Sequence, residues 1–204
     1  MRFINAIKNN KVLAANFSYL SLLQVFNLLL PLITYPYLIR ILGNELYGLV
    51  IYAQAIISYF AIFINYGFNI SATKEISLNR DNLFKVSEIA VSVLSIKLIL
   101  LLFSLLLLLI LILISPIFNQ NKYLFILTMG ICLNEAIFPI WYFQGKEQMK
   151  YITYINLISR VIFTALIFLL VNTPNDYLLV PILNTIGALI TGFISMYLLF
   201  FKDK

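Results

Sequence analysis

The sequence predicts an all-α, polytopic membrane protein. Of its 204 residues, 62% are hydrophobic and only 11% are charged, and the mean hydropathy is +0.98. A soluble domain of this size does not need so much apolar surface. The apolar residues also gather in runs of about 20 or more, the length that an α-helix needs to cross a bilayer, and short polar segments separate the runs.

Six such runs predict six transmembrane helices within one unit, residues 1–204. The first run is longer than a bilayer requires, and Pro31 and Pro36 are expected to kink or break its outer third. A tight turn over residues 43–48 should follow it, and the strongly charged segment 71–85 is predicted to be a loop. The six predicted spans are 12–39, 46–68, 86–114, 123–143, 151–171 and 178–201.

The fourth predicted span ends in aromatic residues followed by a polar run, within the segment Glu135–Lys150. Trp and Tyr favour the membrane–water interface, and lysines beyond them favour the cytoplasmic side. This segment is therefore predicted to be the cytoplasmic exit of the helix. Pro139 should interrupt the helix, and Glu135 lies well inside it. An acid and a helix breaker within a span indicate a packed bundle interior or a wet cavity.

The distribution of basic residues predicts that both termini are cytoplasmic, because cytoplasmic loops are enriched in Lys and Arg. One set of span ends carries ten basic residues, whereas the other set carries only Arg40 and Lys122. The net charge of +6 is therefore interpreted as a topology signal, and no nucleic-acid partner is expected. The ten residues are Arg2, Lys8, Lys11, Lys74, Arg80, Lys85, Lys146, Lys150, Lys202 and Lys204.

Arg160 is the most informative charge within a span. It lies near the middle of the fifth predicted helix, where an unpaired Arg costs at least ~2.5–3.5 kcal/mol. Two roles stay open and do not exclude each other: an ion pair with Glu135 of the preceding helix, or contact with an anionic substrate. Glu135 is accordingly either the partner of Arg160 or a protonatable coupling site.

Two further cations are candidates for substrate contact. Lys97 lies at the boundary between a mixed half and an almost purely aliphatic half of the third span, so it either snorkels to an interface or lines a polar cavity. Arg40 follows the first span, where snorkelling into water is the ordinary outcome. Intramembrane asparagines, such as Asn134, Asn156 and Asn184, are interpreted as interhelical hydrogen-bonding groups.

Other classes of chemistry have little support in the sequence. It contains no histidine, and its single cysteine, Cys132, lies in an apolar run, so neither a disulfide framework nor a metal site is expected. It has no P-loop and no pair of carboxylates arranged for hydrolysis. We expect a protein that is not an enzyme and that uses no cofactor.

Several stretches together resemble the polysaccharide biosynthesis, or O-antigen flippase, family of the MATE/MOP transporter superfamily. They occur in the family's order at Pro36–Gly48, Asn65–Ser77, Phe138–Tyr151, Asn156–Arg160 and Leu178–Asn184. The third stretch, FPIWYFQGKEQMKY, is the most specific. Its family-motif residues are Trp141, Phe143, Gln144, Gly145 and Glu147.

This resemblance implies a carrier in the bacterial inner membrane for surface polysaccharide or lipopolysaccharide biosynthesis. Its substrate would be an undecaprenyl-pyrophosphate-linked oligosaccharide, moved from the cytoplasmic to the periplasmic face. In the family, cationic residues in a central cavity are thought to meet the substrate's pyrophosphate and acidic sugars. Arg40 and Arg160 match basic positions of the family, in keeping with such a role.

The chain departs from the family in length, because such carriers usually consist of two six-helix lobes with the cavity between them. The sequence supplies one lobe, which is expected to be a truncated product, a fragment or half of a dimer. A second lobe, a second copy and other O-antigen assembly proteins are the expected partners. Alternatives are a non-transporting lobe or partner subunit and a multidrug antiporter of the same superfamily. A membrane enzyme is disfavoured because the outer loops are short.

Overall fold

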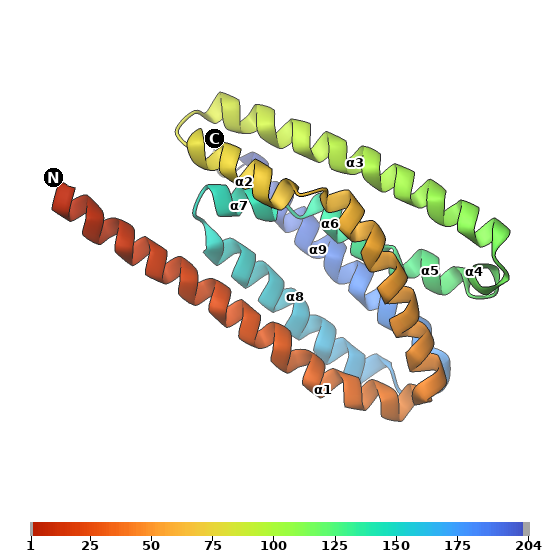
Figure 1. Cartoon of the computed structure of the whole chain (residues 1–204). Coiled ribbons are helices and arrows are strands. Elements are labelled where there is room, and N and C mark those ends of the chain that lie inside the picture. Colours follow the sequence, from red (N-terminus) through yellow and green to blue (C-terminus); the bar gives the residue numbers. More distant parts are fainter. Residues whose placement is uncertain (1, 202–204) are drawn as a thin grey trace.

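The computed structural model describes the backbone of residues 2–201 and the side chains of residues 14–201. That part of the chain folds as a bundle of helices and contains no strand (Figure 1). The elements are α1 (Arg2–Asn65), α2 (Phe68–Leu78), α3 (Leu83–Ile114), α4 (Pro116–Gln120), α5 (Lys122–Thr128), α6 (Gly130–Ile137), α7 (Ile140–Gly145), α8 (Met149–Leu170), the 3-10 helix η1 (Pro174–Leu178) and α9 (Leu179–Phe201).

Helix α1 contains the first two predicted spans as two arms of a hairpin (Figure 1). The arms meet at Gly43, whose φ of 77° and ψ of 166° belong to a region that only glycine adopts readily. The predicted turn over residues 43–48 is thus a single residue. Pro31 and Pro36 lie inside the first arm, which stays helical through both, so the predicted break does not occur.

The charged segment 71–85 is not a loop, as the sequence suggested, but is mostly helical. The backbone turns at Tyr66 and Gly67, both of which have positive φ angles, and α2 then continues to Leu78. After a short turn, the side chain of Asn82 accepts a hydrogen bond from the Lys85 N–H at 3.1 Å and caps α3.

The fourth predicted span consists of three short helices, α5, α6 and α7. The break between α6 and α7 falls at Phe138 and Pro139, as predicted from the proline. Gly130 begins α6 where α9 approaches closely, since a Cβ there would collide with the Thr185 side chain. The last two predicted spans agree with α8 and α9 within two residues.

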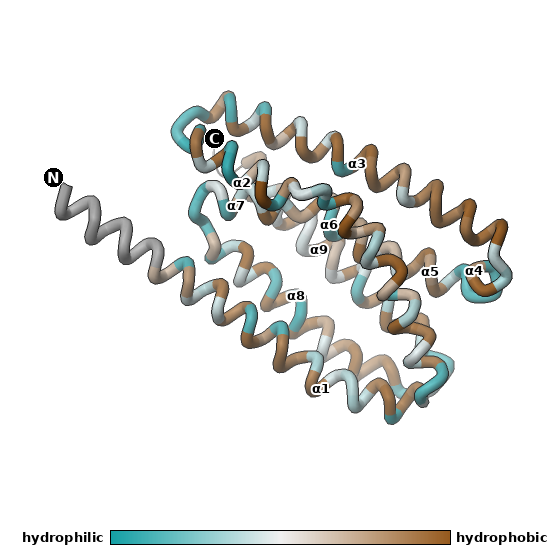
Figure 2. The backbone as a smooth tube through the Cα atoms, in the orientation of Figure 1, coloured by the Kyte–Doolittle hydropathy of each residue, from teal (hydrophilic) through white to brown (hydrophobic). Residues whose placement is uncertain are grey.

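The structure confirms an all-α, multi-pass membrane protein. Five helical segments of the described chain are long and apolar enough to cross a membrane, and the first of them contains both arms of α1. Hydrophobic colours dominate the length of α3 (Figure 2), where Leu102, Leu106 and Leu113 are 61%, 59% and 82% exposed. Such a large uncovered apolar face is suited to lipid rather than to water.

The two ends of the described chain lie at the same end of the bundle, as an even number of passes requires (Figure 1). The side of the membrane that this end faces stays a prediction. Several of the basic residues on which this prediction depends lie outside the residues whose side chains are described, namely Arg2, Lys8, Lys11, Lys202 and Lys204.

Candidate functional site: a polar cavity with a single cation

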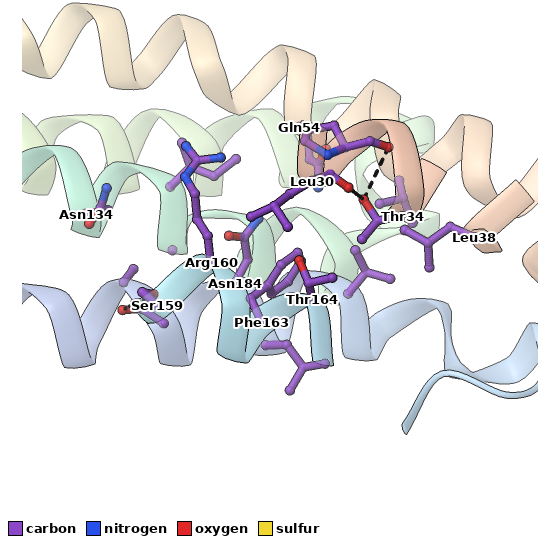
Figure 3. Close-up of a pocket in the computed structure, with 18 of the residues that line it drawn as sticks. Leu30, Thr34, Leu38, Gln54, Asn134, Ser159, Arg160, Phe163, Thr164 and Asn184 are labelled. Atoms are coloured by element: carbon purple, nitrogen blue, oxygen red, sulfur yellow. Dashed lines mark hydrogen bonds between the residues drawn. The ribbon is translucent and has the colours of Figure 1, made fainter. Parts of the chain in front are cut away.

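A cavity of about 300 Å³ lies among the two arms of α1, α6, α8 and α9. It is at the lower end of the volumes typical of ligand sites, ~300–1,000 Å³. Figure 3 shows side chains from these helices converging on the same space. The polar residues that line it are Thr34, Tyr35, Tyr47, Gln54, Asn134, Asn156, Ser159, Arg160, Thr164, Asn184 and Thr191.

Among the described residues that line the cavity, Arg160 is the only one with a formal charge. It lies eleven residues after the start of α8 and ten before its end, about 15 Å from either end at 1.5 Å per residue. Within residues 14–201 its guanidinium makes no hydrogen bond and no ion pair. Five N–H donors and a permanent positive charge therefore face the cavity without a partner.

Glu135 pairs with Lys97, so the predicted ion pair with Arg160 was wrong. The Lys97 Nζ donates to the Glu135 Oε1 at 3.0 Å and also to the Glu135 carbonyl oxygen at 2.9 Å. Pro139 lies four residues after Glu135 and has no N–H, so it cannot donate the usual helical hydrogen bond to the Glu135 carbonyl oxygen. Lys97 thus supplies both a countercharge and the hydrogen bond that the proline removes, at the C-terminal end of α6 where a cation is favoured.

The structure also corrects the interpretation of Lys97 as a cavity residue. Its side chain is fully buried and does not line the cavity. Lys97 belongs to the inward-facing stripe of α3, in line with the buried residues Ala90 and Ser104, each seven positions away. We therefore do not retain it as a substrate contact. Arg40 also lies outside the cavity, exposed near the bend at Gly43.

The family-motif segment forms a structural contact away from the cavity. Trp141 and Phe143 are buried against other parts of the protein. The prediction that this segment is the cytoplasmic exit of the helix stays a prediction. Helix α7 packs on α2 (Figure 1), and a Cβ at Gly145 would come within 2.6 Å of the Ile76 Cγ2 and 3.0 Å of the Thr73 carbonyl oxygen. Only glycine permits that approach.

Polar contacts complete the junction of α2 and α7. The Thr73 hydroxyl lies 3.3 Å from the Trp141 carbonyl oxygen and 3.4 Å from the Gln144 Oε1. Beyond the helices, Arg80 pairs with Glu147 at 2.9 Å, and this hydrogen-bonded carboxylate raises the pKa of the Arg80 guanidinium. The motif residues therefore hold two helices together.

Hydrogen bonding also orders the turn at the opposite end of the bundle, before α9. The Asp176 carboxylate accepts hydrogen bonds from the Thr173 N–H at 2.8 Å, the Thr173 hydroxyl at 2.9 Å and the Asn172 N–H at 3.1 Å. These three donors, those of Thr173 first, hold the pKa of Asp176 below its usual value.

Sequence reasoning underrated several residues of the cavity. Asn134, Asn156 and Asn184 were interpreted as hydrogen-bonding groups between helices, yet all three line it. Asn134 does both, because its Oδ1 accepts from the Thr191 hydroxyl at 3.2 Å. Gln54 was missed altogether, although an amide in the middle of the second apolar run was the available signal.

The site defines the chain as a helical membrane protein whose cavity is suited to anions. A lone guanidinium among amide and hydroxyl groups can bind phosphate or carboxylate, and no carboxylate competes for it there. In the described part of the chain, no three His, Cys, Asp or Glu side chains come together as a metal site would require.

The chain belongs to the polysaccharide biosynthesis protein family, whose model matches residues 13–203. It is 35% identical over 188 residues to a protein of Escherichia coli K12 named "Putative O-antigen transporter", covering 92% of this chain and 45% of that protein. A protein of Shigella dysenteriae with the same name is 32% identical over 183 residues, covering 90% and 46% respectively. The chain thus spans less than half the length of these relatives. No solved structure is significantly similar to it.

Proposed function

We propose that this chain is one six-helix lobe of an O-antigen transporter that moves lipid-linked oligosaccharide repeat units across the bacterial inner membrane. The observation that carries the proposal is Arg160, a cation in the middle of α8 that lines a polar cavity and has no partner within residues 14–201. The names of both relatives support the transport role. The substrate's pyrophosphate supplies the missing counterion, since Arg binds phosphate groups with two parallel hydrogen bonds.

The other polar groups of the cavity suit the sugar part of such a substrate. Asn134, Asn156 and Asn184 offer both donors and acceptors, and sugar hydroxyls require both. A volume of about 300 Å³ accommodates a pyrophosphate and its neighbouring sugar rather than a whole repeat unit. The cavity must therefore open during transport, which agrees with alternating access by two lobes that rock against each other.

A second six-helix unit is part of the proposal for that reason. It is either a second copy of this chain or another polypeptide that supplies the opposite wall. Both termini of the lobe face the cytoplasm, and the substrate moves outward to the periplasmic face. The alternative of a multidrug antiporter for cations is disfavoured, because Glu135, the acid inside the bundle, is already paired with Lys97.

Complementation tests this proposal. The chain is expressed in a strain that lacks its own O-unit flippase, alone and together with the second half of the E. coli relative, and surface polysaccharide is measured. We expect display with one of these combinations and its loss on Arg160→Gln at unchanged protein level. Arg40→Gln is the matched control, because it removes a cation outside the cavity and should leave display intact.

Normal display with Arg160→Glu would contradict the proposal, because a carboxylate at that position repels a pyrophosphate. Failure of every combination, with stably inserted protein, would favour a non-transporting lobe. Restored resistance to cationic dyes in a sensitive strain would favour the antiporter instead.

A further inference from the structure

A second hollow lies against the first, between α8 and α9. It has a volume of about 160 Å³ and an almost wholly apolar lining. Its outer edges are two ridges of side chains at every fourth position, all 45–59% exposed. They are Tyr154, Ile158 and Ile162 on α8, and Ile186, Ile190 and Ile194 on α9. We call this hollow the α8–α9 groove.

The groove opens toward the lipid and not toward water. Both helices are long and apolar enough to cross the membrane, and five of the six ridge residues are isoleucines, while the sixth, Tyr154, lies near the start of α8. From Tyr154 to Leu166, the groove residues of α8 extend about 18 Å along the helix at 1.5 Å per residue. This length matches a stretch of extended hydrocarbon chain lying across one leaflet, about half of a ~30 Å core.

The floor of the groove is also a wall of the polar cavity. Five residues line both hollows, and three of them are small. The Ser159 hydroxyl lies 3.4 Å from the Gly187 carbonyl oxygen. A Cβ at Gly187 would come within 3.0 Å of the Ser159 Oγ, so α8 and α9 are in close contact here. Arg160 follows Ser159 directly and faces the cavity. The five shared residues are Ser159, Phe163, Leu183, Gly187 and Thr191.

We propose that the α8–α9 groove holds the hydrocarbon chain of an anionic amphiphile whose phosphate groups bind Arg160. This inference rests on the proposed function and assigns the chain of its lipid-linked substrate, a polyprenyl chain, to a defined surface. A charged headgroup in the cavity and a long apolar chain cannot share one environment, because the chain gains by staying among apolar groups. The groove is apolar and shares five lining residues with the cavity, so only the contact of α8 with α9 separates the two hollows, and this contact must part for one molecule to occupy both.

The size of the groove supports partial occupancy. A volume of about 160 Å³ is below the range of sites for whole drug-sized ligands. It accommodates the part of the chain nearest the headgroup, while the remainder lies in the bilayer. The groove therefore sets where the chain leaves the protein and selects for a lipid rather than for a free anion.

Photoaffinity labelling of the full chain in lipid nanodiscs tests this inference. The probe is geranylgeranyl pyrophosphate carrying a diazirine on the chain near its head, and adducts are mapped by mass spectrometry. We expect adducts within residues 154–166 and 186–194. Labelling should fall about tenfold or more in Arg160→Gln, as expected for loss of a charge-assisted contact, and inorganic pyrophosphate should compete.

Two variants fill the groove without touching Arg160. Ile158→Trp and Ile190→Trp place a large ring on each ridge and should displace the adducts from the groove. Leu106→Trp is the matched control, because Leu106 is an exposed apolar residue on α3, 59% exposed, and far from the groove in sequence. A phosphatidylcholine with the same diazirine reports ordinary lipid contact, and it should label α3 and the groove alike.

The outcomes separate this inference from the proposed function. Inorganic pyrophosphate binding is measured by calorimetry in the wild type and in Arg160→Gln. If pyrophosphate binding requires Arg160 but the prenyl probe labels α3 as densely as the groove, the groove inference is overturned and the proposed function stands. If pyrophosphate does not bind at all, the proposed function fails as well. If phosphatidylcholine labels the groove and the prenyl probe does not compete with it, the groove is a lipid-covered face only.

Discussion

Replacing Lys97 by Met tests whether the buried pair with Glu135 holds α3 against α6. Met keeps a similar unbranched shape but removes the charge and all three donors. Removing one partner of a buried ion pair typically costs ~3–5 kcal/mol, because the other charge is left uncompensated. Glu135 is 24% exposed, so water can reach it, and we expect Lys97→Met to cost about 3 kcal/mol of unfolding free energy, at the low end of that range.

The chain contains a control at the same distance. Lys85 and Glu88 also pair at 3.0 Å and also involve α3, but their side chains are 47% and 54% exposed. Exposed pairs contribute ~0–1 kcal/mol, so Lys85→Met should cost at most about 1 kcal/mol. Since the N–O distances of the two pairs are equal, the difference in unfolding free energy between the two variants measures the effect of burying the pair.

The double variant Lys97→Met/Glu135→Gln separates the two hydrogen bonds that Lys97 makes. It removes both charges, so the electrostatic part of the loss should be recovered. The backbone carbonyl of residue 135 still has no donor, because Pro139 offers none, and an unsatisfied buried acceptor costs ~1–3 kcal/mol. The double variant should therefore lie between the wild type and Lys97→Met.

Reversible unfolding by sodium dodecyl sulfate in mixed micelles, followed by circular dichroism, gives these free energies. The reasoning is refuted if Lys97→Met costs no more than Lys85→Met. It is also refuted if the double variant is no more stable than Lys97→Met, because the charge of Glu135 would then have no part in the loss.

Two further predictions concern the ends of the bundle. Gly145→Ala should cost ~1–3 kcal/mol by forcing α7 away from Ile76 on α2, measured in the same unfolding assay. Gly48→Ala is its control and should be neutral or stabilising, since nothing lies within 4 Å of a Cβ there. The pKa of Asp176 is lowered in the folded state, so the stabilisation from its hydrogen bonds is present above the unfolded value of ~3.9 and is lost as the pH falls through the folded value. The protection factors of the Asn172 and Thr173 amides, corrected for the intrinsic exchange rate, should fall there, and Asp176→Asn should remove this pH dependence; an unchanged profile in that variant would contradict the assignment.

Hydrophobic run length predicted the long apolar helices but only some of the bends: Gly43 and Pro139 lie where a turn and a break were predicted, whereas the turn at Tyr66 and Gly67 was not predicted. A run of apolar residues fixes how far a helix can extend, whereas a bend depends on φ and ψ at single positions. Thus Gly43 alone turns the first pass into the second. Helix α2 packs closely against Gly145, about 70 residues away in the sequence, and no local pattern contains that contact.

The site was predictable in part for a related reason. Arg160 could be found because a cation in mid-span is costly wherever it points. The partner of Glu135, which is Lys97 and not Arg160, could not be found, because adjacency along the chain does not fix the rotation of a helix about its axis. That rotation places Lys97 on the buried face of α3 with Ala90 and Ser104. The buried face cannot be recognised in the sequence, because leucine and isoleucine occupy almost every position after Lys97.

Pro139 connects the break in the fourth predicted span with the buried pair of Lys97 and Glu135. The proline removes the N–H that would bind the Glu135 carbonyl, and Lys97 takes that place at 2.9 Å. Once there, Lys97 also neutralises the Glu135 side chain. Neither partner of this pair lines the cavity, so the pair acts on the packing of α3 against α6, and Arg160 carries the formal charge among the described residues that line the cavity. Weakening Lys97 should therefore loosen the bundle at α6, whereas the anion-binding group of the cavity is lost only by changing Arg160 itself.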